Sequence, residues 1–239
     1  MSSLTLTVLL FALFQAYNCQ KSPEIIPVPG GLSGSGTSTR YWDCCKPSCA
    51  WLIPETNEIA PVQACEIDGV TPIDDNSQSG CEVNGVSYAC TNQQPWIVND
   101  TLAYGFTAAS FSGGVDNSRC CTCVLLSFQG DLKGKQMLAQ ITNTGGDLYE
   151  NHFDIAVPGG GVGIFNLGCM SQWNTTENGW GERYGGISSL SDCSQLPSVL
   201  QPGCRFRFDF MNGVDNPPVT FEEVECPSEL SAITKCIPA

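Results

Sequence analysis

The amino-acid sequence predicts a mainly β protein with long loops and few short helices. The clearest signal lies at residues 205–210, where Phe alternates strictly with charged residues and would face one side of a strand. Residues 219–226 alternate more loosely, and three further β-prone runs are bounded by Gly, Pro or Asn, at 123–128, 136–142 and 152–157. Helical patterning is confined to 191–196 and 227–233. Short strands joined by Gly-rich turns favour a barrel or a sandwich over a parallel α/β sheet.

The chain begins with an apolar run that extends from Leu4 to Ala16. A bilayer span needs about 20 such residues, so this run is too short for one. A secretory signal peptide fits better, although a leading Lys or Arg is missing, and a retained anchor is the alternative. We therefore expect residues 1–19 to be a signal peptide, cleaved between Ala16 and Gln20, and the protein to be secreted and extracellular.

Residues 20–37 are rich in Pro, Gly and Ser and lack a core-forming pattern, which predicts a flexible leader. Cysteines recur from there to Cys236, so residues 38–239 are expected to form a single domain. No Ser/Thr-rich linker leads to a second cysteine-bearing module, so we expect no appended binding domain.

The cysteine content indicates an oxidising compartment. Of the 15 cysteines, Cys19 lies in the expected cleavage region, which leaves 15 − 1 = 14, an even number that suggests seven disulfides. A metal site at residues 120–123 is the competing interpretation. That segment lacks a second Cys-x-x-Cys pair, and the chain has only one histidine, so we expect no metal.

The formal net charge is −14, and the ten Lys and Arg residues do not cluster. Phosphate backbones require concentrated positive charge, so the composition argues against nucleic-acid binding. An acidic surface suits a neutral substrate without identifying one. Two sequons, at Asn99 and Asn174, predict glycosylated surface loops.

Two segments concentrate groups suited to catalysis. Residues 38–49 contain three cysteines, two aromatic residues, two cations and a single carboxylate, that of Asp43. Three potential disulfide anchors around this carboxylate would hold it with little freedom, as a catalytic group requires. Residues 151–165 place Asp154 between Phe153 and Ile155, surroundings that raise the pKa of a carboxyl group. Hydrolysis of a glycosidic bond uses such a pair, one acid and one carboxylate.

These segments resemble those of the family 45 glycoside hydrolases, small endoglucanases that cut β-1,4-glucans. The resemblance covers essentially all of 38–236, including residues 184–188 and 215–217. It implies a six-stranded double-psi β-barrel crossed by a long open groove, and catalysis without a cofactor. In the family pattern Asp154 is the proton donor and Asp43 the general base, and the reaction inverts the anomeric centre. Asp147, which follows two glycines, would be a third carboxylate that closes over substrate and tunes the acid; a plain turn residue is the alternative.

The resemblance also implies a set of substrate-binding residues: Thr39, Arg40, Tyr41, Lys46, Trp51, His152 and Tyr184. Tyr41 would line the sugar ring at the cleavage point, and Trp51 would stack on a more distant glucosyl unit. Thr39, Arg40 and Lys46 would form hydrogen bonds with sugar hydroxyls. His152, the only histidine, is expected to have a structural role beside Asp154.

The remaining tryptophans receive different expectations. Trp42 is expected in the core, because it would point away from Tyr41 in an extended segment. Trp173 and Trp180 flank a sequon and are candidates for extending the groove.

The family's disulfide pattern implies seven pairs: Cys44 with Cys169, Cys45 with Cys81, Cys49 with Cys120, Cys65 with Cys90, Cys121 with Cys236, Cys123 with Cys226, and Cys193 with Cys204. Two departures from the family pattern stand out. Leu167 is an extra residue before Gly168, and residues 170–183 are atypical, so one end of the groove is expected to differ.

The sequence therefore predicts a monomeric hydrolase that acts on internal bonds of cellulose-like β-1,4-glucans. Three alternatives remain open. A xyloglucan-specific enzyme would use the same chemistry in a wider groove. An expansin-like, non-hydrolytic glucan-binding protein would share the barrel and the His-Phe-Asp segment but not the base at Asp43. A disulfide-rich defence or inhibitor protein would leave both carboxylate segments unexplained.

Overall fold

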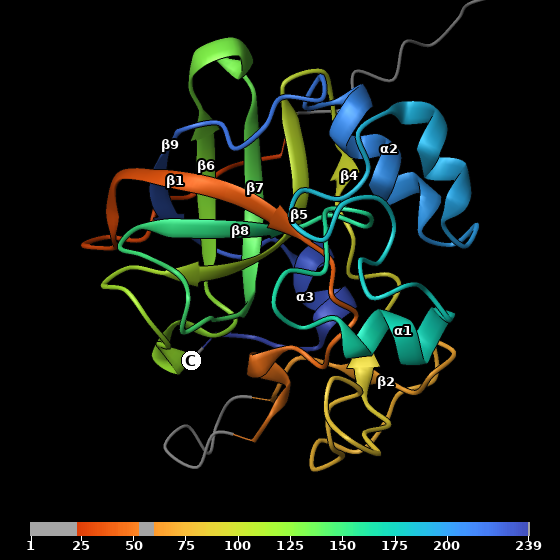
Figure 1. The fold of residues 1–239 in the computed structure, drawn as a ribbon. Coiled ribbons are helices and arrows are strands. Elements are labelled where there is room, and N and C mark those ends of the chain that lie inside the picture. Colours follow the sequence, from red (N-terminus) through yellow and green to blue (C-terminus); the bar gives the residue numbers. More distant parts are fainter. Residues whose placement is uncertain (1–22, 53–59, 239) are drawn as a thin grey trace, which may run out of the picture.

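The computed structural model of the protein describes residues 23–52 and 60–238. The expected signal peptide and Cys19 lie outside these residues. Seven strands form the main sheet (Figure 1): β1 (Ser33–Tyr41), β4 (Trp96–Ile97), β5 (Leu102–Ser110), β6 (Cys123–Phe128), β7 (Gln136–Asn143), β8 (His152–Ala156) and β9 (Val219–Val224). Two short strands, β2 (Ala64–Cys65) and β3 (Tyr88–Ala89), pair separately below the sheet.

The main sheet closes into a six-stranded barrel. Its strand order is β4-β5-β7-β6-β9-β1-β8, and an additional antiparallel pairing of β5 with β8 closes the ring, while β4 extends β5 outside it. The pairs β1–β8 and β5–β7 are parallel, and the other barrel pairs are antiparallel. The expected mainly β fold with a six-stranded barrel is confirmed.

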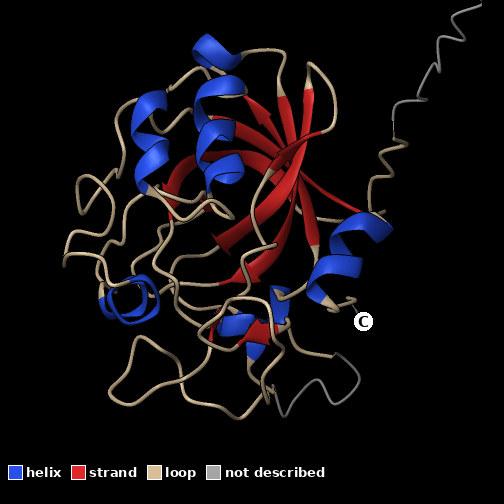
Figure 2. Cartoon of the chain, turned by 90° about the vertical axis from the view of Figure 1, so that its right-hand side faces the viewer, coloured by secondary structure: helices blue, strands red, loops and turns tan. Residues whose placement is uncertain are grey.

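Helices cover part of the barrel (Figure 2). They are α1 (Leu167–Trp173), α2 (Gln201–Asp209) and α3 (Ser228–Thr234), together with short 3-10 helices at Ser48–Ala50, Asn117–Arg119, Gly130–Leu132 and Leu190–Gln195. None of the helices in the described residues is long and apolar enough to cross a membrane. The short helices expected at 191–196 and 227–233 are confirmed.

Strand β5 is buried on both faces, unlike β1, most of whose residues are exposed or half-buried. Strand β5 is buried along its whole length, and its side chains alternate between two hydrophobic clusters. Leu102, Tyr104 and Phe106 belong to one cluster, whereas Ala103 and Ala109 belong to the other. Strand residues point alternately to opposite faces, so two hydrophobic clusters are needed to cover both faces of β5. For this reason the sequence of β5 lacks the alternation of polar and apolar residues that marks a half-exposed strand.

The strand expected at residues 205–210 is wrong, because residues 205–209 belong to α2 and Phe210 is its C-cap. Phe206 and Phe210 are four residues apart, one helical turn, and their buried rings stack at a centroid distance of 5.2 Å. Pro202 stands in the first turn, where helices accept proline, and the Cys193–Cys204 disulfide ties the helix to its neighbour. The packing of Phe206 and Phe210, four residues apart, has therefore outweighed the strict alternation of Phe and charged residues that predicted a strand.

The expected flexible leader is also corrected. Strand β1 begins at Ser33, which pairs with Glu222 of β9, so residues 33–37 are part of the barrel. Farther upstream, Pro27 forms a bridge with Val224. A Gly- and Ser-rich segment therefore serves as a barrel strand, because backbone hydrogen bonding requires no apolar side chains.

The structure contains seven disulfides, with the pairing that the resemblance implies. Their fourteen cysteines are the residues from Cys44 to Cys236, spread over loops, strands and helices. The Cys44–Cys169 bond joins the end of β1 to α1 across 125 positions, whereas Cys193–Cys204 spans only 11.

Loop length predicts different contributions of these two buried disulfides to stability. We expect Cys44→Ser/Cys169→Ser to lower the free energy of unfolding by about 2 kcal/mol more than Cys193→Ser/Cys204→Ser, since the longer loop loses more entropy on closure. Urea denaturation of both variants under identical conditions measures the difference. Equal losses would show that local packing, rather than loop closure, governs both bonds.

Candidate active site

Three acidic side chains meet in one groove. Asp43, Asp147 and Asp154 all line a cavity of about 60 Å³, which adjoins a wider cavity of about 430 Å³. The two cavities share Tyr41, Leu148, Gly163 and Ile164 as well as Asp147 and Asp154. Asp43 and Asp154, separated by 111 positions in the chain, are therefore neighbours in the fold.

The parallel pairing of β1 with β8 brings the two segments together. Thr39 lies opposite Asp154 in the register, and Tyr41 opposite Ala156. Asp43 follows β1 by two residues. The next residue, Cys44, adopts a left-handed backbone conformation with φ 64°, and its disulfide to Cys169 holds this turn in place.

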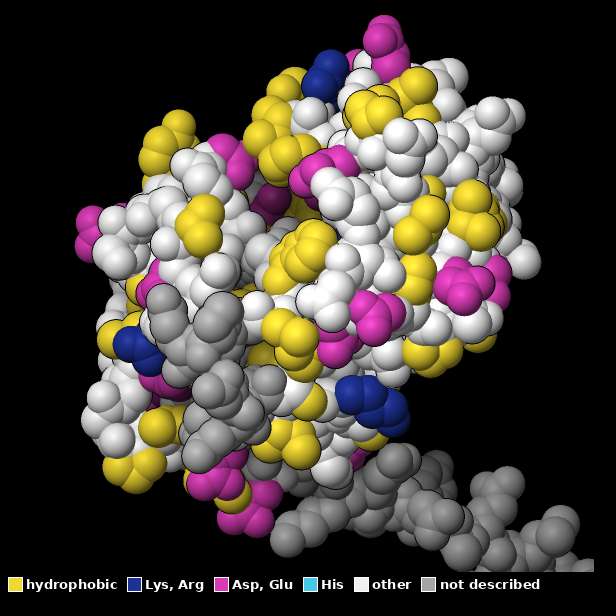
Figure 3. Space-filling view, turned by 90° about the horizontal axis from the view of Figure 1, so that it is seen from below, with side chains coloured by type: hydrophobic (Ala, Val, Ile, Leu, Met, Phe, Trp, Pro, Cys, Tyr) yellow, Lys and Arg dark blue, Asp and Glu magenta, His cyan; other side chains and the backbone are white. Residues whose placement is uncertain are grey.

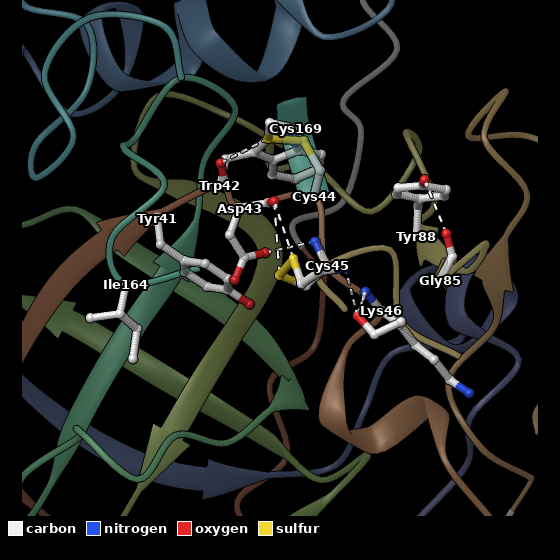
Figure 4. The surroundings of a disulfide bond; sticks show 12 residues. Tyr41, Trp42, Asp43, Cys44, Cys45, Lys46, Gly85, Tyr88, Ile164 and Cys169 are labelled. Atoms are coloured by element: carbon white, nitrogen blue, oxygen red, sulfur yellow. Dashed lines mark hydrogen bonds between the residues drawn. A yellow bond between two sulfur atoms is a disulfide. The ribbon is translucent and has the colours of Figure 1, made fainter. Parts of the chain in front are cut away.

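Asp43 is a buried carboxyl group with a backbone donor. Its side chain is 9% exposed, and Oδ1 accepts a hydrogen bond of 2.9 Å from the N–H of Cys45 (Figure 4). Burial raises the pKa of Asp43 to about 7, the Cys45 N–H lowers it, and the charge of Asp147 raises it further. The carboxyl group is thus poised to bind a proton near neutral pH.

Asp154 has a hydroxyl donor instead. Thr39 Oγ1 donates a hydrogen bond of 2.5 Å to Asp154 Oδ1. Burial raises the pKa of Asp154 to about 7; the Thr39 hydroxyl opposes this rise, and the charges of Asp43 and Asp147 add to it. The negative charges of Asp43 and Asp147 thus add to burial in favouring the protonated form of Asp154.

His152 orients Thr39, which agrees with the expected structural role beside Asp154. Its Nε2 lies 2.8 Å from Thr39 Oγ1, and its Nδ1 accepts a bond of 3.4 Å from the N–H of Tyr149. Since the Thr39 proton goes to Asp154, the network assigns the imidazole proton to Nε2. Burial lowers the pKa of His152, which favours this neutral form.

Asp147 sits on an anchored loop that follows β7. Its side chain is exposed, whereas the next residue, Leu148, is buried, and the Leu148 carbonyl accepts a 3.0 Å bond from Gly114. The loop therefore holds a free carboxylate over the groove while its own backbone is tied down.

Two aromatic residues line the groove as expected. Tyr41 is partly exposed, and its Oη accepts a 3.1 Å hydrogen bond from Asn143 Nδ2. Burial of its hydroxyl, together with the charges of Asp43 and Asp154, raises the pKa of Tyr41 well above its usual value, so the hydroxyl keeps its proton. Tyr184 lines the wider cavity and is 69% exposed.

The two cations expected to bind sugar hydroxyls are engaged within the chain. Arg40 Nη2 lies 2.7 Å from Asp215 Oδ1 and donates a 2.7 Å bond to the Gly185 carbonyl. Lys46 Nζ donates to the carbonyls of Asp75 and Ser77, at 2.5 and 3.1 Å. Both side chains thus donate to backbone carbonyls of distant segments, and Arg40 also lines the wider cavity.

The tryptophans occupy distinct surroundings. Trp42 is 5% exposed and belongs to the core, as expected. Trp51 is partly buried, with Lys46 Nζ 3.3 Å from its ring centroid, and it does not line the two cavities. Trp173 and Trp180 pack against the core cluster rather than in these cavities.

Several groove residues were not assigned from the sequence. Ile164 and Phe165, at the end of the second carboxylate segment, line the smaller cavity and are about half exposed. Arg183 and Asn216 line the wider cavity, and Asp215 does as well. Residues 215–217 are among the segments that resemble the family, and this was the one indication in the sequence that Asp215 and Asn216 lie at the site.

Comparisons with known proteins show the family of this chain. The family described as Glycosyl hydrolase family 45 matches residues 35–237. The chain belongs to glycosyl hydrolase family 45. It is 59% identical over 216 residues to an endoglucanase of Phaedon cochleariae, covering 90% of this chain and 89% of that one. It is 50% identical over 215 residues to an endoglucanase of Cryptopygus antarcticus, covering 89% of this chain and 94% of that one.

A solved structure supports the same assignment. The cellulase crystal structure from the Antarctic springtail Cryptopygus antarcticus matches with a TM-score of 0.80 and 50% identity. The match covers 86% of this chain and 98% of that chain. The expected family 45 membership is thus confirmed, and the barrel is that of a glycoside hydrolase.

The raised pKa of Asp154 predicts a stability change with pH. The folded-state pKa of about 7 exceeds the ordinary value of 3.8, so the unfolded chain releases this proton first as the pH rises. The free energy of unfolding should therefore fall between about pH 4 and pH 7. In Asp154→Asn this loss is absent, and the variant should gain about 1 kcal/mol or more relative to the wild type between pH 4 and pH 8.

Thermal or urea unfolding at several pH values measures the difference in free energy of unfolding between variant and wild type. Asp209→Asn removes an exposed carboxylate at the end of α2 and is the matched control; for this variant the difference should not change with pH. Parallel curves for Asp154→Asn and the wild type would contradict the raised pKa.

Proposed function

We propose that this family 45 enzyme is an inverting endo-β-1,4-glucanase that hydrolyses internal bonds of cellulose-like chains, with Asp154 as general acid and Asp43 as general base. The observation that carries the proposal is the convergence of both carboxyl groups on one open groove, each with a pKa raised to about 7. A group with such a pKa transfers protons efficiently near neutral pH.

The hydrogen bonds suggest how each carboxyl group is oriented. Thr39 occupies Oδ1 of Asp154, which leaves Oδ2 to carry the proton toward the glycosidic oxygen. The Cys45 N–H occupies Oδ1 of Asp43, which leaves its other oxygen to accept a proton from water. Water then attacks the anomeric carbon on the face opposite the leaving group, and one proton enters through Asp43 as another leaves from Asp154.

The smaller cavity is suited to hold that water. Its volume of about 60 Å³ exceeds the roughly 30 Å³ that one water occupies in the liquid, and both carboxyl groups line it. Inversion requires a separation of about 6.5–9.5 Å between the two carboxyl groups, which is our expectation for this pair. Asp147 would face bound substrate from its anchored loop and raise the proton affinity of Asp154 through its charge.

Substrate binding would use the aromatic groove residues and Thr39. Tyr41 would contact the ring at the cleavage point, and Tyr184 would contact a sugar in the wider cavity. The surface in Figure 3 mixes acidic with hydrophobic side chains and has few Lys or Arg, which suits a neutral glucan. Trp51 remains our candidate for a distant stacking site outside the two cavities.

We propose that the protein is exported as a monomer and glycosylated at Asn99 and Asn174. Seven disulfides favour an oxidising compartment, and Asn174 is exposed in the turn after α1. The alternatives are xyloglucan specificity, which the atypical residues 170–183 keep open, and a non-hydrolytic role, which the presence of Asp43 disfavours.

Removal of either catalytic carboxyl group should abolish turnover. We expect Asp154→Asn and Asp43→Asn each to lower kcat by about 10³-fold or more, since proton transfer alone contributes roughly 10²–10⁴-fold. Binding of a cello-oligosaccharide should change little. A reducing-sugar assay with calorimetric binding measures both quantities, and near-normal kcat in either variant would remove that residue from its assigned role.

The stereochemistry of the product tests the mechanism separately. Hydrolysis of a β-1,4-linked cello-oligosaccharide should release the α-anomer first, because one displacement inverts the anomeric carbon. Proton NMR recorded within the first minutes detects it before mutarotation. A β-anomer would instead indicate retention, and parallel digestion of xyloglucan and soluble cellulose derivatives separates the two substrate classes.

A further inference from the structure

The wider cavity forms what we call the wide end of the groove. The turn at residues 182–187, which carries Tyr184, lines it. Glu182 and Gly186 exchange two backbone hydrogen bonds, of 3.0 and 2.9 Å. The turn packs so tightly on the Gly-rich segment 159–161 that a Cβ on Gly186 would lie 1.8 Å from the Gly159 carbonyl oxygen. The place of Tyr184 in the groove thus depends on how this turn is held.

Two buried arginines hold the turn from different elements. Arg40 of β1 and Arg207 of α2 both donate to the Gly185 carbonyl, at 2.7 and 3.3 Å. Arg207 also donates to the carbonyl of Ile187. Their side chains are only 9% and 7% exposed, so neither guanidinium is freely solvated.

One carboxylate serves both arginines. Asp215 Oδ1 lies 2.7 Å from Arg40 Nη2 and 2.8 Å from Arg207 Nη2, and neither arginine forms another ion pair in the part of the chain that the structure describes. The charge of Arg207 lowers the pKa of Arg40, as burial does, whereas the charge of Asp215 raises it. Asp215 therefore offsets the repulsion between two positive groups that contact the same carbonyl oxygen.

Asp215 is itself held close to the catalytic strand. The carbonyl of Pro217 accepts a 2.6 Å bond from Ser38 Oγ, and Asn216 Oδ1 lies 3.4 Å from Arg40 Nη1. Both Ser38 and Arg40 belong to β1, directly on either side of Thr39. The loop, the two arginines and the turn form one connected unit at the wide end of the groove.

We propose that Asp215 is a positioning residue that holds the 182–187 turn through Arg40 and Arg207, and thereby sets where Tyr184 meets the glucan chain. Asp215 acts through the turn and not on the bond that is cleaved. The inference rests on the proposed function only in taking Tyr184 as a substrate contact.

Asp215→Asn tests this role, since it keeps the shape of the side chain and removes its charge. We expect KM for a long cello-oligosaccharide to rise about tenfold, the effect of losing one charge-assisted contact. The kcat value should stay within about twofold of the wild type, and the pH profile of kcat should not move. Asp215 is not among the groups that act on Asp154 or Asp43, and Arg40, which does act on Asp154, keeps its charge and its bond to the Gly185 carbonyl. Asp215→Glu, which keeps the charge, should restore most of the affinity.

A double-mutant cycle identifies the path of the effect. Tyr184→Ala alone should raise KM, and adding Asp215→Asn to it should raise KM by less than about twofold more, because both changes remove the same contact. Glu182→Gln is the matched control: it removes a charge from the same turn, and its exposed side chain forms no hydrogen bond or ion pair among the described residues. Its KM should equal that of the wild type.

Three results would overturn the proposal. An unchanged KM in Asp215→Asn, with Tyr184→Ala impaired, would remove the role of Asp215 and leave the proposed function intact. Additive effects of the two changes would mean that Asp215 acts independently of Tyr184. No effect of Tyr184→Ala would remove Tyr184 from substrate binding and the inference with it. Circular dichroism of each variant monitors folding, and Asp215→Glu supplies the comparison if Asp215→Asn does not fold.

Discussion

The parallel pairing of β1 with β8 is the constraint on which the catalytic site depends. Its register sets Thr39 beside Asp154, and the chain then needs only the turn at Cys44 to bring Asp43 to the same groove. A shift of one residue would turn the Thr39 side chain away from Asp154 and direct a core residue toward the groove. Closure of the barrel through β5 and β8 prevents such a shift, because β8 is paired on both edges.

Burial of the Asp43 and Asp154 carboxyl groups costs free energy, and the same burial raises their pKa values. Two carboxyl groups with pKa values raised to about 7 are less favourable to bury at alkaline pH than apolar groups would be. The disulfides at Cys44, Cys45 and Cys49 surround Asp43 and constrain the backbone that carries it. Covalent constraint near Asp43 thus accompanies the burial of its carboxyl group, as expected where a site must hold a group in an unfavourable environment.

The strand β1 serves both ends of the groove. Thr39 donates a hydrogen bond to Asp154, whereas Ser38 and Arg40 hold the loop at 215–217 and the turn at 182–187. Arg207 joins this second group only because α2 is a helix, which buries its guanidinium beside the Ile187 carbonyl. On the expected strand, Arg207 would have faced solvent with Arg205 and Asp209, so the error in secondary structure also concealed the partner of Asp215.

The sequence by itself determined most barrel strands, because apolar patterning between turn residues marks them locally. The family, the two catalytic candidates and the cysteine pairing came from the resemblance of its motifs to family 45, since motifs keep their residue types while spacing alone leaves the pairing open. The sequence did not reveal β5, whose two buried faces remove the alternation that marks a strand. It also left open which groups Arg40 and Lys46 contact within the chain, since a cation can bind a sugar hydroxyl or a backbone carbonyl with the same chemistry. Only the tertiary structure placed them against backbone carbonyls, because these contacts depend on which carbonyls and carboxylates from distant segments come within hydrogen-bonding distance.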